Sequence, residues 1–318
     1  MYDHIYSAIN LYLTPLQHGF MKKRSTVTNL ACFTQYTSEI LDARGQVDAI
    51  YLDFQKAFDQ IDLYVLLEKL RCFGFTEGLC ELMSSYLFNR SQFVRYRNHI
   101  SPAVFPTSGV PQGSNLGPLL FLMFVNDIVD YITCEKLLFA DDIKLFSKVA
   151  NSADSHSIQC SLNQVINWCQ LNHLNLNISK CFVVRFTRSA SPVHYGYSLG
   201  NNVLEDKKLV TDLGVSFDAK LSFSNHVFNL ISSCHKAYGF IYRNSRDFTK
   251  VETVIALFNA FVRSRMEYAA LIWYPIYNVH IDRLEGVLRL FLKYLCFLVD
   301  NVYPPEVLIC PYYLSYSI

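Results

Sequence analysis

The sequence predicts an α+β fold, on three observations. Strand-like apolar runs at residues 47–54 and 181–186 are separated by stretches with helical spacing, without strict alternation of strand and helix. Apolar residues make up 51% of the 318 residues, which is enough to bury one large core or two smaller ones. After about residue 223 the apolar pattern becomes helical, so we expect two domains, 1–222 and 223–318.

The first half of the chain supplies a central strand and several helices. Residues 47–54 (VDAIYLDF) form a β-rich apolar run that predicts a buried strand. Asp62 is suited to cap a helix that runs through Leu70. Thr76 is suited to cap a second helix that runs to about Phe88. The other elements expected here are a strand over 92–97, a glycine-dotted loop over 108–118 and a helix over 119–131.

The second half begins with a predicted hairpin over residues 137–146, whose turn is formed by Asp141 and Asp142. The polar residues 152–157 predict a loop, and the apolar spacing of 158–171 predicts a helix after it. The remaining expectations are a strand over 181–186, a turn region over 189–202, helices over 225–299 and a tail over 303–318 without regular structure.

The formal net charge of +1 indicates no particular partner, but basic residues are concentrated locally. Between residues 82 and 126 there is no acidic residue, and the basic ones there are Arg90, Arg95 and Arg97. Residues 235–265 hold six basic residues against two acidic ones. Such surfaces suit a phosphate backbone, and they are equally compatible with ordinary solvated faces.

The ten cysteines are dilute and form no C-x-x-C pair or Cys/His cluster, which favours buried free thiols in a reducing compartment. The longest apolar run, residues 118–125, is too short to span a bilayer, and the N-terminus has no secretory signal pattern. We expect a soluble intracellular protein, nuclear or cytoplasmic, without a membrane partner. The sequence does not predict an oligomeric state.

Two adjacent aspartates interrupt the apolar run 137–146 (LLFADDIKLF). Unpaired buried carboxylates cost several kcal/mol each, and a divalent cation relieves both the burial and their repulsion. Asp53, at the end of the predicted central strand, supplies a third carboxylate. Three carboxylates that bind two Mg²⁺ ions suit in-line phosphoryl displacement. The alternative is structural: Asp53 and Asp59 as helix caps, and Asp141 and Asp142 as a turn only.

Six segments, in this order, resemble motifs of reverse transcriptases, and most narrowly those of non-LTR (LINE-type) retrotransposons. The segments are QHGFMKKRST (17–26), YLDFQKAFDQID (51–62), SGVPQGSNLGPLLFLMFVNDI (108–128), FADDIKLF (139–146), LNLNISKCFVVRF (174–186) and LGVSFDAKLSFSNHV (213–227). The resemblance implies a right-hand polymerase fold, with partial fingers and an antiparallel palm sheet over 1–222 and a helical thumb over 223–318. The segment 213–227 resembles the primer grip.

The resemblance implies an RNA-directed DNA polymerase that joins a deoxynucleoside triphosphate to a primer 3′-hydroxyl on an RNA template. Asp53 and Asp141 would coordinate two Mg²⁺ ions with help from Asp142, and Lys180 would protonate the departing pyrophosphate. Phe58 matches an aromatic steric gate that excludes a 2′-hydroxyl. The residues implied at the nucleotide are Phe54, Phe58, Gln112 and Gly113.

The chain lacks the upstream fingers motif whose arginine binds the triphosphate in that family, so we expect an N-terminally truncated member. The alternative function is an inactive relic, or a domesticated nucleic-acid-binding fragment that cannot hold a triphosphate. A further alternative is a metal-dependent nuclease or phosphotransferase that uses the same carboxylates, which leaves the loop PQGSNLGP at 111–118 unexplained.

Overall fold

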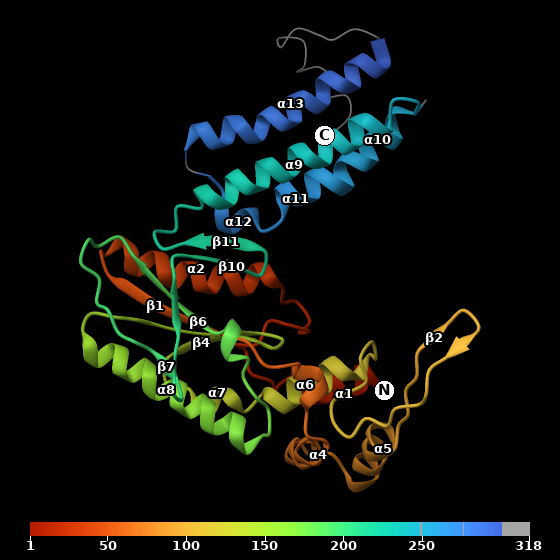
Figure 1. The fold of residues 1–318 in the computed structure, drawn as a ribbon, viewed down its shortest axis with the longest axis vertical. Helices are drawn as coiled ribbons and strands as arrows, with labels where there is room; N and C mark the ends of the chain where they lie inside the picture. The colour runs from red at the N-terminus through yellow and green to blue at the C-terminus, as the bar shows by residue number, and fades with distance from the viewer. Residues whose placement is uncertain (249, 276, 301–318) are drawn as a thin grey trace. The chain divides into compact units, whose positions relative to one another are not determined.

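The computed structural model describes residues 1–248, 250–275 and 277–300, so the expected tail over 303–318 lies outside the described residues. The chain divides into two compact units, Met1–Lys208 and Leu209–Ile318 (Figure 1). The division lies before a strand pair, β10 (Leu209–Asp212) and β11 (Val215–Asp218), and not near residue 222. The reason is that this pair packs on the second unit, where Ser216 N donates to His226 Nδ1 at 3.2 Å.

The first unit is built on a five-stranded sheet in the order β4-β5-β1-β6-β9. The central strand β1 pairs antiparallel with both neighbours, and six of its seven residues are buried, as the sequence predicted. Strand β9 pairs parallel with β6 at the edge. The bounds are β1 Gln46–Leu52, β4 Glu135–Phe139, β5 Asp142–Lys148, β6 Phe182–Thr187 and β9 Glu205–Lys207.

Helices cover both faces of this sheet, with α2 on one face and α8 on the other (Figure 1). From α2, Phe33 packs edge-on against Phe146 of β5 and Phe186 of β6. On the other face, Trp168 of α8 lies fully buried beside Phe54. The helices of this unit are α1 Tyr2–Ile9, α2 Thr26–Asp42, α3 Ala57–Gln60, α4 Leu63–Cys72, α5 Glu77–Leu87, α6 Leu116–Val125, α7 Ile128–Tyr131 and α8 Ser152–Leu171.

The predicted helix α4 is present, and Asp62 caps it by accepting hydrogen bonds from Tyr64 N and Val65 N. The predicted loop over 152–157 is wrong, because α8 begins at Ser152. A capping box starts it there: the Asn151 side chain accepts from the amide of Asp154, whose carboxylate accepts from the Asn151 amide. The helix expected over 119–131 is two helices, α6 and α7.

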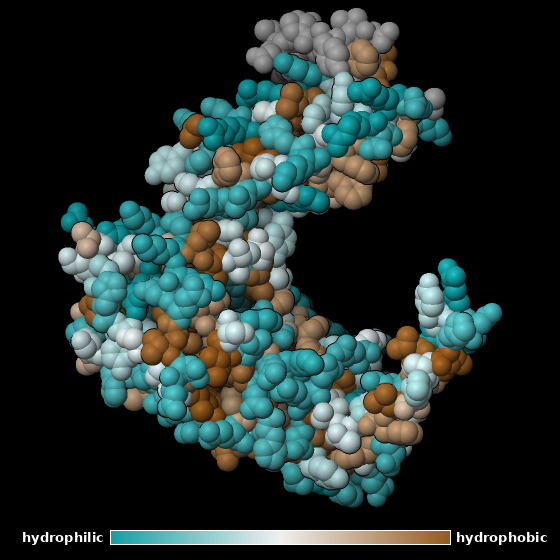
Figure 2. Space-filling model, viewed as in Figure 1, coloured by the Kyte–Doolittle hydropathy of each residue, from teal (hydrophilic) through white to brown (hydrophobic). Residues whose placement is uncertain are grey.

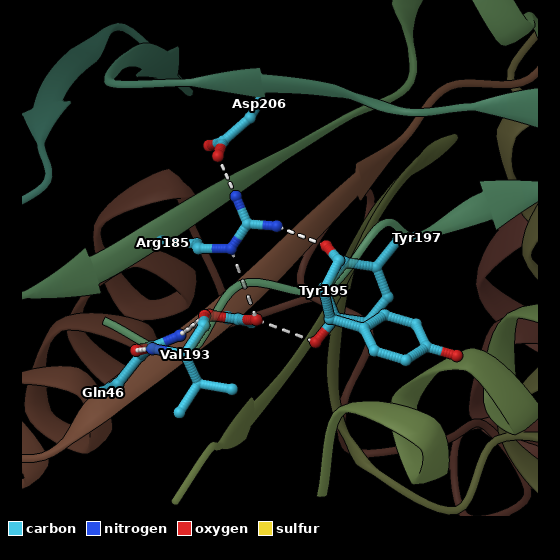
Figure 3. A network of polar contacts seen from close by, with 7 residues as sticks. Gln46, Arg185, Val193, Tyr195, Tyr197 and Asp206 are labelled. Atoms are coloured by element: carbon cyan, nitrogen blue, oxygen red, sulfur yellow. Dashed lines mark hydrogen bonds and ion pairs between the residues drawn. The ribbon is translucent and has the colours of Figure 1, made fainter. Parts of the chain in front are cut away.

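A buried polar network joins β1 to β6 and β9 (Figure 3). Asp48 is 0% exposed and accepts from Tyr197 Oη at 2.8 Å and from Gln46 Nε2 at 2.7 Å. Burial raises the pKa of Asp48, an effect that these hydrogen bonds and Arg185 oppose. Arg185 also bonds to Asp206 and to the carbonyl of Tyr195. This network links the central strand β1 to the edge strand β9 through β6.

The second unit is mainly helical, as predicted. Its core contains Phe258 stacked on Phe291, with ring centroids 3.8 Å apart, and a hydrogen bond of 2.9 Å between Ser245 Oγ and Tyr294 Oη. The elements are α9 Ser224–Asn244, α10 Val251–Phe258, a π-turn Asn259–Arg263, α11 Ser264–Glu267, α12 Ala270–Trp273 and α13 Asn278–Asp300. Among the described residues, no helix is both long and apolar enough to cross a membrane.

Candidate active site

The sheet register brings the predicted carboxylates to one end of the sheet. Strand β1 ends at Leu52, which pairs with Ile143 of β5, so Asp53 follows next to the start of β5. The β4–β5 pair closes with Phe139 opposite Asp142, which leaves a two-residue turn formed by Ala140 and Asp141. The turn is therefore one residue earlier than predicted. Asp142 begins the strand β5 and is exposed.

The charges at this end of the sheet influence one another. Asp141 is half-buried, and burial raises its pKa; the neighbouring Asp53 carboxylate raises it further, and Lys180 opposes both effects. Lys180 Nζ lies 3.2 Å from Asp53 Oδ2, with the lysine side chain 64% exposed and the aspartate side chain 22% exposed. Asp53, Asp141 and Lys180 are therefore one electrostatic group, assembled from three separate sequence motifs.

The described residues contain no ready group of three or more His, Cys, Asp or Glu side chains placed to bind a metal ion. The predicted three-carboxylate cluster is thus not preassembled. The donor set nevertheless fits a hard cation, because Asp53 Oδ2 is buried without an aligned hydrogen bond and carboxylate oxygens are the ligands that Mg²⁺ prefers. The charged partner that lies near that oxygen is Lys180 Nζ, at 3.2 Å.

Backbone hydrogen bonds fix Lys180 and Asp53 to each other. Asn177 N donates to the Asp53 carbonyl at 2.7 Å, and Gln55 N donates to the Asn175 carbonyl at 2.8 Å. Lys180 ends a short 3₁₀ turn, Ile178–Lys180, that follows directly. The contact between the lysine and the aspartate is therefore set by main-chain pairing and not by side chains alone.

The turn that carries Asp141 is held by a buried glutamine. Gln17 is 3% exposed, and its Oε1 accepts from Ala140 N at 2.9 Å while its Nε2 donates to Ala140 O at 3.2 Å. The same Oε1 accepts from Gly19 N at 2.8 Å. Ala140 has a φ of +55°, a left-handed conformation that a residue with a Cβ adopts at a cost. Gln17 satisfies both backbone groups of that strained residue.

Gly19 and Asn29 complete this support, which sequence reasoning did not assign. A Cβ on Gly19 would lie 2.2 Å from Ala140 N, so only glycine permits the approach. Asn29 is buried, and its Nδ2 donates to the Leu138 carbonyl at 3.0 Å. The sign available in the sequence was Gln17 and Gly19 in the motif 17–26. Ala140, the partner of Gln17, lies 123 positions away along the chain.

Phe58 is half-buried between two other rings. It stacks on Phe121, with centroids 4.5 Å apart, and meets Phe20 edge-on at 6.0 Å. Its position is therefore fixed by packing while part of the ring stays accessible. Phe54, by contrast, is 3% exposed and packs beside Trp168, so its side chain belongs to the core. Of the two phenylalanines implied at the nucleotide, the structure leaves only Phe58 exposed enough for contact.

The loop with Gln112 and Gly113 is tied to the segment after Phe58. Gln112 Nε2 donates to Asp59 Oδ1 at 2.7 Å, and Val110 N donates to the Phe58 carbonyl at 2.8 Å. Gly113 has a φ of +76°, and no atom lies within 4 Å of the position that a Cβ would take, which leaves room for a ligand to approach the backbone on that side. Asp59 thus anchors the glutamine; it lies within α3 and does not cap that helix.

Residues 2–217 match the family described as "Reverse transcriptase (RNA-dependent DNA polymerase)". The chain is 30% identical over 231 residues to the probable RNA-directed DNA polymerase from transposon BS of Drosophila melanogaster, covering 69% of this chain and 25% of that protein. It is 28% identical over 226 residues to the RNA-directed DNA polymerase from mobile element jockey of the same species, covering 67% and 24%.

The chain spans about a quarter of the length of these curated relatives. A solved telomerase from Candida tropicalis, in complex with a TWJ fragment of telomeric RNA, aligns with all of this chain and 56% of its own, at 12% identity and a TM-score of 0.48. The family match covers most of the first unit and the start of the second, and it includes Asp53, Asp141 and Lys180. Together with the antiparallel sheet, it confirms the predicted α+β right-hand polymerase fold. The chain belongs to the reverse transcriptase family and, within it, to the non-LTR retrotransposon type.

Proposed function

We propose that this chain is the polymerase part of a non-LTR retrotransposon enzyme, which extends a DNA primer with deoxynucleotides on an RNA template. The observation that carries the proposal is the meeting of Asp53, Asp141 and Lys180 at one end of the sheet, within a family match over 2–217. If the turn at Asp141 had only a structural role, it would need neither the Asp53 carboxylate nor Lys180 beside it. The similarity to RNA-directed DNA polymerases does not favour the alternative of an inactive fragment.

Asp53 and Asp141 are the residues that would bind two Mg²⁺ ions, with Asp142 beside them. When bound, the two ions supply charge that activates the attacking hydroxyl and stabilises the leaving oxygen. Lys180 would donate a proton to the departing pyrophosphate, at the usual scale of about 10²–10⁴ in rate. Its 3.2 Å contact with Asp53 means that the ammonium must move away from that carboxylate to reach a substrate.

Phe58 and the loop with Gln112 are the parts that would contact the incoming nucleotide. The Phe58 ring is held between Phe20 and Phe121, so it cannot retreat from a 2′-hydroxyl without disturbing both neighbours. Gln112 is oriented by Asp59, and Gly113 leaves the backbone open. We assign the fingers and palm to the first unit and the thumb to the second, where the basic residues of 235–265 suit phosphate contacts.

The first test is the variant Asp141→Asn, assayed for Mg²⁺-dependent primer extension on an RNA template. Loss of the carboxylate charge removes a metal ligand, so we expect at least about a 10³-fold fall in rate. The control Asp130→Asn changes an exposed aspartate of α7 and keeps the wild-type rate. An unchanged rate in Asp141→Asn contradicts the metal role, and wild-type protein that binds template without extending a primer contradicts the proposed activity.

A second test concerns the choice of sugar. Replacing Phe58 by valine removes the ring that faces the 2′-position, and we expect ribonucleotide incorporation relative to deoxyribonucleotide to rise about 10- to 100-fold. The matched control is Phe73→Val, a half-buried phenylalanine that follows α4. Equal sugar selectivity in the wild type and both variants would leave Phe58 a packing residue.

A further inference from the structure

The hairpin of β2 (Arg95–Tyr96) and β3 (His99–Ile100) extends away from the rest of the first unit (Figure 1). Every residue from 91 to 105 is exposed, on both faces of the hairpin. Each strand has only two residues, supported by one further bridge between Gln92 and Val104. A hairpin of this size cannot bury an apolar face of its own, and it holds little of the energy of the fold.

Its exposed side chains are nevertheless strongly apolar, and Figure 2 shows brown hydrophobic residues among the hydrophilic ones of this hairpin. Six large apolar side chains are between 56% and 71% exposed: Phe93, Val94, Tyr96, Ile100, Val104 and Phe105. Single exposed apolar residues are common, but six within thirteen positions form a patch of the kind that marks an interaction surface.

The charge of the hairpin indicates what kind of partner covers this patch. It carries Arg95, Arg97 and His99, and the sequence has no acidic residue between 82 and 126. Arg97 lies over the Tyr96 ring, 5.4 Å from its centroid, so a cation and an aromatic face are presented together. An apolar surface that carries basic residues and no acidic ones complements a chain with phosphates and flat unpaired rings.

We propose that this hairpin, residues 91–105, is a binding surface for single-stranded nucleic acid, separate from the carboxylate site. Bases stack on the exposed aromatic rings, and the arginines contact the phosphates between them. A duplex fits the surface less well because its bases are already stacked and paired. The contact requires neither a metal ion nor a nucleoside triphosphate, so it stands or falls independently of the polymerase activity.

The test is fluorescence anisotropy with the full chain, a labelled single-stranded RNA of about 20 nucleotides, long enough for one binding site, and the matching duplex, without Mg²⁺ and without deoxynucleotides. The variant Tyr96→Ser/Phe105→Ser removes two stacking rings, and we expect its affinity for the single strand to fall about 10-fold or more. The variant Arg95→Gln/Arg97→Gln lowers affinity and makes the dependence on salt shallower. The logarithmic slope changes by about 0.7 for each phosphate that the variant no longer neutralises.

The control Tyr12→Ser removes a tyrosine that is 68% exposed elsewhere on the first unit, and it keeps wild-type affinity. Thermal unfolding of both hairpin variants stays at the wild-type temperature, because the changed side chains are exposed. Single-strand affinity within twofold of wild type in both hairpin variants overturns the proposal. So does an equal loss for the strand and the duplex, or a protein partner that the patch binds while RNA does not compete. Asp141→Asn retains the binding, which separates this proposal from the polymerase activity.

Discussion

Two of the hairpins in the first unit, β4–β5 and β2–β3, have similar turns and opposite surroundings. The β4–β5 pair closes through Ala140 and Asp141, and the β2–β3 pair closes through Arg97 and Asn98, each with two residues between the paired strands. The first turn residue is left-handed in both, with a φ of +55° at Ala140 and +53° at Arg97. Ala140 is 8% exposed, whereas all residues around Arg97 are exposed.

The difference separates two uses of one backbone shape. At Ala140, Gln17 and the close approach of Gly19 hold a strained turn in one position, as the proposed metal role of Asp141 would require. At Arg97 the same left-handed conformation carries the same cost, but the turn is exposed, so water can satisfy its backbone groups. The β4–β5 hairpin, held by Gln17 and Gly19, would position the proposed metal ligand, whereas the exposed β2–β3 hairpin would offer the proposed surface for single-stranded nucleic acid.

The largest effect is expected at Gly19, whose backbone approaches Ala140 very closely. Gly19→Ala places a methyl group 2.2 Å from Ala140 N and 2.9 Å from Ala140 Cα, and backbone atoms cannot yield as a flexible side chain does. We expect the free energy of unfolding to fall by about 3 kcal/mol or more, measured by urea denaturation. The turn must shift to accept the methyl group, so primer extension falls as well.

The matched control is Gly78→Ala in α5, where nothing lies within 4 Å of the added Cβ. Alanine favours a helix over glycine, so this variant is expected to gain up to about 1 kcal/mol. If both variants have the same stability as the wild type, the approach of Gly19 to Ala140 does not constrain the turn.

The next effect concerns the glutamine. Gln17→Leu leaves the buried N–H and C=O of Ala140 without their partner, at about 1–3 kcal/mol for each orphaned group before relaxation. We expect a loss of about 2–4 kcal/mol in unfolding free energy. At temperatures where the variant stays folded, kcat falls about 10- to 100-fold, because Asp141 is displaced from its place in the site.

A structural role alone would lower stability without changing the Mg²⁺ requirement. The discriminating measurement is therefore the Mg²⁺ concentration for half-maximal extension, which rises in Gln17→Leu. The control Gln35→Leu alters an exposed glutamine of α2 that bonds to Glu39, and it moves neither quantity beyond the range of surface substitutions. An unchanged Mg²⁺ requirement with lowered stability would limit Gln17 to holding the fold.

The parts of this unit that sequence could predict are those decided by neighbouring residues. The buried strand β1 follows from its apolar run, and α4 follows from the Asp62 cap. The start of α8 was missed although it is also local, because a polar stretch concealed the capping box of Asn151 and Asp154. A search for N-caps inside polar segments would have found it.

The support of the turn could not be predicted, because it depends on strand pairing between distant residues. Gln17 pairs in parallel with Leu138, and only that bridge brings its side chain to Ala140. The motif similarity indicated Asp53 and Asp141 as candidate metal-binding residues. It did not indicate that the hairpin turn lies one position earlier than expected. Register, once fixed, decides which aspartate sits in the turn and which begins the strand.

The smallest expected effect is the change of stability with pH. It again distinguishes the β4–β5 hairpin from the β2–β3 hairpin. His18, which follows Gln17 in the chain, is 3% exposed, and its Nδ1 lies 2.8 Å from Thr28 Oγ1. Burial, with Arg24 and Lys144 nearby, lowers the pKa of His18 to about 4. The folded chain therefore keeps this ring neutral, while the unfolded chain takes up a proton near its ordinary pKa of about 6.5.

Stability from the neutral His18 ring is complete above about pH 6.5 and is lost as the pH falls toward about 4. Between about pH 7 and pH 5 we expect a loss of about 1–2 kcal/mol, allowing for solvent screening, and urea denaturation at several pH values in that range measures it. His18→Gln makes the profile shallower, whereas His99→Gln, on the exposed hairpin, leaves it as in the wild type. Equal slopes of unfolding free energy against pH in all three proteins would show that burial of His18 contributes nothing to the pH dependence of stability.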